Sequence, residues 1–242
     1  MAVKIFVDFD GTITTHDVGN LFFREFGGEA CDTFIADYHQ EKISAQECFR
    51  REAAAAGGIL PNDLNALLDR QTIDPGFKDF VDFCRLRDLE FHIVSDGLDY
   101  YIERVLRAHG IQNVSYVANA LSLEPAGANG RQSFSLTFPH SDSVCDRCAC
   151  CKRNFMLTHS GDDDIIVFIG EGYSDRCPVQ YADIVFAKED LQHFCQRENI
   201  SYYLYASFHD VTDRLGRLLA RRQLRKRRRA ELKRKEAFQR ET

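Results

Sequence analysis

Acidic and hydroxyl side chains follow three predicted buried strands, in each case at the point where the strand ends. The strands are apolar runs at residues 3–7, 91–94 and 165–169. Because ligands of open α/β sheets bind at the carboxyl ends of parallel strands, the side chains beyond these ends are expected to lie together. They are Asp8 and Asp10, Ser95 and Asp96, and Glu171 and Asp175.

The chemistry that such a group favours is phosphoryl transfer. Several carboxylates at one edge of a sheet repel one another, so cations must offset their charge. Lys152, at a predicted junction of loop and helix, supplies one cation, and oxygen ligands favour Mg²⁺ as the other. A metal ion and a lysine can offset the charge on phosphoryl oxygens while an aspartate acts as the nucleophile.

The elements that would position these residues alternate between strand and helix. Fully apolar strands with helices between them are typical of an α/β fold, in which helices cover both faces of a parallel sheet. From residue 16 to 74 the pattern is instead helical throughout, with a capping box at Ser44–Glu47 and a further helix opening at Pro61. A half-exposed strand over 133–138 is expected to form a hairpin through a turn at 127–130.

Four motifs in order resemble those of the haloacid dehalogenase (HAD) superfamily of phosphatases. They are residues 8–12, Ser95, Lys152 and residues 170–175. The resemblance extends to about residue 205 and implies a Rossmann-like parallel sheet with a helical-bundle cap of the C1 type inserted after the first strand. The implied division is a core of residues 1–15 and 75–208, a cap of residues 16–74, and a basic helical tail of residues 209–242.

The resemblance also implies a role for each motif residue. Asp8 would attack phosphorus and become an aspartyl-phosphate, while Asp10 would protonate the leaving oxygen and then activate water. Ser95 and Lys152 would hold the phosphoryl oxygens. Mg²⁺ would be bound by the Asp8 carboxylate, the Asp10 backbone carbonyl and the first acid of the fourth motif, which is Glu171.

Glu171 departs from the pattern of the superfamily, which usually has aspartate at this position. The extra methylene lengthens the side chain, and Mg²⁺ requires near-octahedral geometry. Three arrangements accommodate the change: the loop adjusts, a water molecule intervenes, or Asp175 takes a larger share in binding the metal.

The helical insert corresponds to the cap of the phosphoserine-phosphatase-like branch. A cap over the site excludes water and selects small substrates. Asp17 lies where that branch places an acid facing the substrate, and Arg50 or Arg51 is a candidate to reach in from the cap. Asp96 and Gly97, beyond the second strand, are further candidates for binding the substrate. For each cap residue a solvated helix face is the alternative.

Four cysteines lie within seven residues before Lys152, and this loop resembles the MtnX-like group, 2-hydroxy-3-keto-5-methylthiopentenyl-1-phosphate phosphatases of methionine salvage. The segments 176–178 and 182–188 resemble the same group. Thiols at this spacing can also bind structural Zn²⁺, and buried free thiols or a local disulfide are the alternatives. The four are Cys145, Cys148, Cys150 and Cys151.

The charge of the chain is divided between an acidic body and a basic tail. Residues 213–242 carry a net charge of +9, and the remainder carries −15. A solvated tail paired with the acidic body is favoured over a nucleic-acid arm, because aromatic residues do not alternate with the basic ones. No apolar run is long enough for a membrane span and no signal-peptide pattern is present, so a cytoplasmic protein without a membrane partner is expected.

These features together predict a Mg²⁺-dependent phosphomonoester hydrolase that acts on a small phosphorylated metabolite. An MtnX-like substrate is the first choice. Phosphoserine, phosphocholine and phosphoethanolamine phosphatases are alternatives within the enzyme class. A catalytically weak HAD-fold protein that binds partners through its basic tail is the contrasting alternative.

Overall fold

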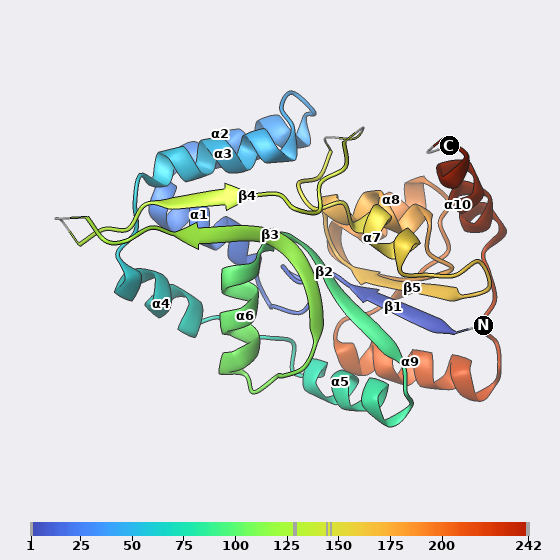
Figure 1. Cartoon of the computed structure of the whole chain (residues 1–242). Helices are drawn as coiled ribbons and strands as arrows, with labels where there is room; N and C mark the ends of the chain where they lie inside the picture. Colours follow the sequence, from blue (N-terminus) through green and yellow to red (C-terminus); the bar gives the residue numbers. More distant parts are fainter. Residues whose placement is uncertain (1, 128–129, 144, 146, 241–242) are drawn as a thin grey trace.

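A seven-stranded sheet runs through the computed structural model of the chain, which describes residues 2–127, 130–143, 145 and 147–240 (Figure 1). Its order is β4-β3-β2-β1-β5-β6-β7, and every neighbouring pair is parallel except β3 with β4. The strands are β1 (Val3–Val7), β2 (Glu90–Leu98), β3 (Ser115–Leu123), β4 (Phe134–Thr137), β5 (Ile165–Gly170), β6 (Ile184–Ala187) and β7 (Tyr203–Leu204).

The register of the central strands brings their carboxyl ends level. Val7 of β1 pairs with Ile93 of β2 on one side and with Ile169 of β5 on the other. The residues beyond these three positions therefore begin at the same edge of the sheet. This confirms the predicted parallel α/β fold and the edge at which the motif residues meet.

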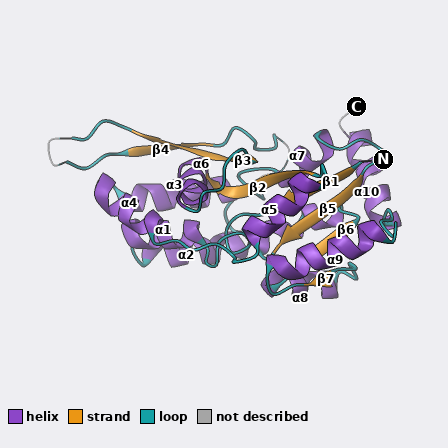
Figure 2. Cartoon of the chain, turned by 90° about the horizontal axis from the view of Figure 1, so that it is seen from below, coloured by secondary structure: helices purple, strands orange, loops and turns teal. Residues whose placement is uncertain are grey.

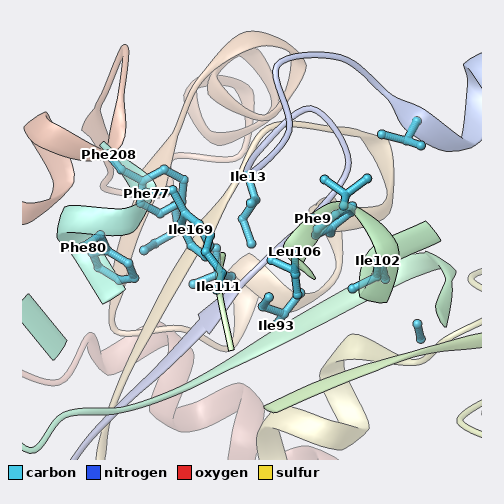
Figure 3. Close-up of a cluster of buried hydrophobic side chains, with 14 of the residues drawn as sticks. Phe9, Ile13, Phe77, Phe80, Ile93, Ile102, Leu106, Ile111, Ile169 and Phe208 are labelled. Atoms are coloured by element: carbon cyan, nitrogen blue, oxygen red, sulfur yellow. The ribbon is translucent and has the colours of Figure 1, made fainter. Parts of the chain in front are cut away.

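Helices cover both faces of the sheet, as the alternating pattern predicts. One face carries α5 (Phe77–Leu86), α6 (Asp99–Ala108) and α9 (Phe208–Ala220), and the other carries α7 (Lys152–Thr158) and α8 (Glu189–Arg197). On the first face the rings of Phe77, Phe80 and Phe208 pack against one another, as Figure 3 shows. Two short 3₁₀ turns, η1 (Tyr173–Arg176) and η2 (Pro178–Gln180), follow β5.

Four helices occupy the predicted insert and are called the cap here. They are α1 (Val18–Gly27), α2 (Ala30–His39), α3 (Ala45–Ala56) and α4 (Pro61–Asp69). Ser44 caps α3 as the predicted capping box requires, since its hydroxyl accepts a hydrogen bond from the Glu47 backbone N–H at 3.1 Å, but the Glu47 carboxylate pairs with Arg51. Gly57 ends this helix in a left-handed conformation.

The β3–β4 hairpin extends beyond the sheet and packs against the cap (Figures 1 and 2). Phe134 lies edge-on to Phe22 of α1, and Ile59 pairs with Gln132 outside the named strands. The hairpin therefore joins the core to the cap through contacts, in addition to the chain segments that connect the two ends of the cap to the core. Part of its predicted turn, at residues 128–129, lies outside the described residues.

The basic tail forms two helices rather than one, and both lie against the core. Val211, Leu215 and Leu218 of α9 are buried, and α9 packs on α5. A second helix, α10 (Arg228–Arg240), lies beside η2, with Ala230 fully buried. The expected single, solvated helix is therefore wrong, because Ala230 and Arg227 dock the second helix on the core, whereas the expected pairing with the acidic body is seen in the ion pair of Arg234 with Asp183.

Arg227 anchors the segment between the two tail helices. Its guanidinium donates to the backbone carbonyls of Val179, Gln180 and Ala182, at 2.6 to 3.0 Å. Its backbone N–H donates to Asp183 at 2.9 Å.

No helix in the described part of the chain is long and apolar enough to cross a membrane.

We expect Arg227→Met to release α10 while leaving the rest of the fold intact. The substitution leaves three partly buried carbonyls without a donor, so the free energy of unfolding should fall by about 1–3 kcal/mol. Urea denaturation measures this loss, and amide exchange in α10 should rise at the same time. Arg225→Met, at an exposed position two residues away, serves as the control and should change stability by less than about 0.5 kcal/mol. Equal losses in the two variants would contradict the anchoring role.

Candidate active site

Lys152 joins the ends of β1 and β5 through its ammonium group. It begins α7, and its Nζ lies 2.6 Å from Asp8 Oδ1, 2.6 Å from Asp175 Oδ1 and 3.0 Å from Ser174 Oγ. The Lys152 side chain is only 1% exposed. Burial disfavours its charge, but the carboxylates of Asp175 and Asp8 outweigh this effect and raise the pKa of Lys152. The lysine therefore stays charged between two buried acids.

Both oxygens of Asp175 are engaged in holding the loop that follows β5. Oδ1 accepts from Lys152, and Oδ2 accepts from the backbone N–H groups of Glu171 and Gly172, at 2.9 and 3.1 Å. The carboxylate thus fixes the backbone from which the Glu171 side chain projects. Of the three arrangements left open for the fourth motif, a larger metal-binding share for Asp175 agrees least with this geometry.

Asp10 connects the sheet to the beginning of the cap. Its Oδ1 accepts from the backbone N–H groups of Val18 and Gly19, at 3.0 and 3.2 Å, in the first turn of α1. Its Oδ2 accepts from the Tyr101 hydroxyl at 2.8 Å and from the Ser95 hydroxyl at 3.3 Å. The carboxyl group is thereby held in one orientation.

Burial is the main cause of the raised pKa values of the acids at this edge. It raises the pKa of Asp10 to about 7, with the charge of Asp17 adding to the effect. Burial likewise raises the pKa of Asp8, and Asp175 raises it further, whereas Lys152 opposes both. Asp10 can therefore exchange a proton near neutral pH, while the lysine favours the ionised form of Asp8.

Gly11 makes room for the Glu171 side chain. A Cβ built on Gly11 would lie 2.9 Å from the Glu171 carboxyl carbon and 2.9 Å from Oε1. Gly11 also has φ +67°, a conformation that favours glycine. Burial, followed by the charges of Asp175 and Asp17, raises the pKa of Glu171 to about 7. The longer acid is thus accommodated directly against the first motif.

A cavity of about 380 Å³ opens above these residues, between the sheet edge and the cap. Phe23, Ile35 and Phe49 give it an apolar wall from the cap. Among its lining residues in the described part of the chain there is no lysine or arginine. Seven lining residues are acidic: Asp8, Asp10, Asp17, Glu52, Asp96, Glu171 and Asp190.

The donor set at the floor of the cavity suits a hard divalent cation. Asp8 and Glu171 supply carboxylate oxygens in a site with excess negative charge, and Mg²⁺ usually takes one or two protein carboxylates together with substrate phosphate. Within the described residues no three His, Cys, Asp or Glu side chains are already arranged around one point. The residues present therefore fit a cation whose coordination shell is completed by oxygens of the substrate.

The predicted substrate-binding residues are placed in different ways. Asp17 lines the cavity, although its carboxylate also caps α1 by accepting from the Asn20 backbone N–H at 2.7 Å. Gly97 lies against Asp10 and Tyr101, where no side chain would fit. Arg50 and Arg51 are not brought to the cavity.

The two arginines interact instead with their own helix. Arg50 donates to Gln46 and Arg51 to Glu47, each one turn away in α3. Arg50 also lies over the Phe138 ring. This placement gives no support to the expectation that either arginine reaches the substrate.

Asp96 organises the cysteine loop, although it also borders the cavity. Its Oδ1 accepts from the backbone N–H groups of Ala149 and Cys150, at 2.8 and 2.6 Å. These bonds fix the backbone just before Lys152. The first role of Asp96 in this structure is therefore to position the lysine.

The cysteine loop contains free thiols. All nine cysteines of the chain are unpaired, and three of the loop, Cys148, Cys150 and Cys151, are buried. Within the described ranges, Cys145 and these three do not belong to any group of three or more His, Cys, Asp or Glu side chains that could hold a metal ion. The structure thus gives no support to the predicted zinc site, because the loop is tied to Asp96 instead of closing around an ion.

Three residues of the site have no clear signal in the sequence. Tyr101 lies in the first turn of the helix predicted after the second strand, and only the fold shows that its hydroxyl contacts Asp10. Ser174 belongs to the fourth motif, but its bond to Lys152 depends on the turn of the loop. Glu52 lies in the cap, and helical periodicity alone does not distinguish its buried face from the exposed one.

The fold and the ordered motifs define a phosphatase of the HAD superfamily. Residues 3–202 match the family described as "Putative Phosphatase", and the chain belongs to this family. An Exiguobacterium sibiricum protein named 2-hydroxy-3-keto-5-methylthiopentenyl-1-phosphate phosphatase is 29% identical over 231 residues, or 89% of this chain and 97% of that protein. One of the same name from Geobacillus kaustophilus is 28% identical over 221 residues, or 88% and 96%.

Solved structures show the same fold at lower sequence identity. A phospho-aspartyl intermediate analogue of phosphoserine phosphatase has a TM-score of 0.64 at 16% identity, covering 88% of this chain and 98% of that one. A phosphoserine phosphohydrolase-like protein from Francisella tularensis has a TM-score of 0.61 at 18% identity, covering 88% and 99%. These likenesses confirm the Rossmann-like arrangement predicted from the motifs.

We expect Gly11→Ala to reduce phosphatase activity far more than its effect on folding explains. A Cβ at this position displaces the Glu171 carboxyl, and misplacement of about 1 Å in a site can cost about 100-fold in rate. Gly110→Ala is the matched control, since Gly110 has φ +70° with nothing within 4 Å of an added Cβ. Both variants should lose about 1–2 kcal/mol of stability from the left-handed conformation. Similar activities for the two would show that the contact with Glu171 is unimportant.

Proposed function

We propose that this phosphatase hydrolyses phosphomonoesters with Mg²⁺ through an aspartyl-phosphate on Asp8. The observation that carries the proposal is the buried ammonium of Lys152, held 2.6 Å from Asp8 at the floor of the cavity. A lysine at this place can offset charge on the phosphoryl oxygens as they leave the ester. Asp10 lies two residues further along, with a pKa suited to proton transfer near neutral pH.

The first step forms a bond between an Asp8 oxygen and phosphorus and breaks the bond from phosphorus to the leaving oxygen. Asp10 gives its proton to that oxygen, so the leaving group departs as an alcohol. Water then attacks phosphorus while Asp10 takes back a proton, releasing inorganic phosphate and the free Asp8 carboxylate. Ser95, which is fully buried and donates to Asp10 in the free protein, would hold a phosphoryl oxygen.

The residues that would hold Mg²⁺ are Asp8 and Glu171 through their carboxylates, with the Asp10 backbone carbonyl. When bound, the ion neutralises charge on the phosphate and on the acids around it. Asp175 is assigned to Lys152 and to the loop backbone, because both of its oxygens are engaged there. Glu171, held against Gly11, is then the fourth-motif acid available to the metal.

The substrate we propose is the one named for the relatives, 2-hydroxy-3-keto-5-methylthiopentenyl 1-phosphate, or a close analogue. Those relatives align over 88–89% of this chain. The volume of the cavity is within the range of small-molecule sites, and its apolar cap wall suits a thioether tail. Phosphocholine and phosphoethanolamine remain second candidates, since the acids in the wall can accept an ammonium group. The nine free cysteines favour action in the reducing cytoplasm.

The proposed chemistry is tested by hydrolysis of p-nitrophenyl phosphate with and without Mg²⁺. We expect turnover that is lost with EDTA and restored by Mg²⁺, and a fall of at least about 10³-fold in Asp8→Asn, which lacks the nucleophile. Mass spectrometry of the quenched enzyme should detect a phosphoryl adduct on Asp8. Wild-type activity no higher than that of Asp8→Asn would instead favour a binding protein without catalysis.

The assignment of Glu171 to the metal predicts a change in Mg²⁺ requirement. In Glu171→Gln the Mg²⁺ concentration for half-maximal activity should rise at least about tenfold, because a charged ligand is replaced by a neutral one. Calorimetric titration of Mg²⁺ into the protein provides a readout that does not depend on turnover. The control is Glu29→Gln at an exposed position, which should leave both values unchanged. An unaltered Mg²⁺ affinity in Glu171→Gln would remove Glu171 from the metal site.

A further inference from the structure

We propose that Glu52 and the other acidic residues that line the same cavity select phosphomonoesters whose leaving group carries no carboxylate. The proposal rests on the phosphatase function above and adds a specificity-determining residue from the cap. In this proposal the substrate lies along the cavity in one direction. Its phosphate binds at the end near Lys152, and an uncharged leaving group with hydroxyl or carbonyl oxygens lies beside Glu52.

Glu52 is buried in the cap yet lines the cavity. It lies on α3, one turn after Cys48, and is 4% exposed. Phe23 and Phe49 make part of the cap wall apolar, and the Glu52 carboxyl group lies beside the thiol of Cys48, a weak donor that hydrogen-bonds to it. A buried carboxyl group in contact with a substrate cavity is costly unless something there hydrogen-bonds to it.

The cavity offers no cationic partner to a second carboxylate. Its described lining contains no lysine or arginine, and Lys152 beneath it is already paired with Asp8 and Asp175. Burial lowers the pKa of His39, so this lining imidazole is neutral at physiological pH. A leaving group with a carboxylate would therefore lose its hydration among seven acids without gaining an ion pair.

An uncharged oxygen of the leaving group can instead accept a hydrogen bond from Glu52. Burial, together with the charge of Asp17, raises the pKa of Glu52 to about 8. At neutral pH the group is then mainly protonated, and it can donate to a carbonyl or hydroxyl oxygen of the leaving group. Sites that hydrogen-bond one feature of a substrate reject analogues that leave the buried group unsatisfied.

The test compares two substrates that differ at one carbon, glycerol 3-phosphate and 3-phosphoglycerate. The first has a neutral leaving group, and the second has a carboxylate in place of a hydroxymethyl group. We expect the wild-type enzyme to favour glycerol 3-phosphate by at least about tenfold in kcat/KM. A wild-type preference for 3-phosphoglycerate, or no preference, would overturn the inference without any variant being made.

Two substitutions then test Glu52 itself. Glu52→Gln keeps a neutral hydrogen-bonding group and should leave the ratio of the two kcat/KM values within about threefold of wild type. Glu52→Lys supplies the missing cation and should lower the ratio at least about tenfold, by improving hydrolysis of 3-phosphoglycerate. Glu47→Lys, five residues earlier in the same helix and half-exposed beside Arg51, is the matched control and should not change the ratio.

The outcomes separate this inference from the proposed function. Absence of Mg²⁺-dependent hydrolysis of p-nitrophenyl phosphate by wild type would overturn both. Normal hydrolysis of that ester, with an unchanged ratio in a folded Glu52→Lys protein, would overturn only the role of Glu52. Thermal unfolding establishes whether each variant is folded, and if Glu52→Lys is not, the wild-type ratio and Glu52→Gln decide the inference.

Discussion

The ion group formed by Lys152 with Asp8 and Asp175 is the interaction on which the site depends. All three side chains are buried, and removing charges from water costs free energy that only good geometry offsets. Here one ammonium group contacts both carboxylates at 2.6 Å, and backbone N–H groups satisfy the second oxygen of Asp175. Removing the lysine would leave two buried acids facing each other. The ends of β1 and β5 and the start of α7 are therefore fixed relative to one another.

The remaining parts of the site are built outward from this group. Asp175 orders the loop that carries Glu171, and Asp96 orders the loop that carries Lys152. Asp10 then connects the end of β1 to the cap, because two backbone N–H groups in the first turn of α1 donate hydrogen bonds to its carboxylate. The cap is thus held to the core by a catalytic candidate, so the position of α1 and the orientation of the acid depend on each other.

The parallel sheet, the edge of the site and the motif residues could be predicted from sequence, because apolar runs define strands and three of the four motifs begin where a run ends. The direction of individual side chains could not. Asp96 turns to backbone groups more than fifty residues away. In α3 the sequence made Arg50 or Arg51 the candidate to reach the substrate, whereas the structure brings Glu52 to the cavity. Arg227 could not be placed either, since its acceptors come from a turn far earlier in the chain.

The two ends proposed for the cavity would differ in charge for a physical reason. A phosphate end has to bind a dianion, so it requires cations, and Lys152 is held at that end by acids that keep it protonated. Any further lysine or arginine in the cap would compete for the phosphate and for the acids of the floor. The cavity lining that the structure describes contains neither, which would leave the phosphate a single place to bind and let hydrogen bonds and apolar contact select the leaving group. In the proposed arrangement the core would determine which reaction occurs and the cap would determine which ester undergoes it.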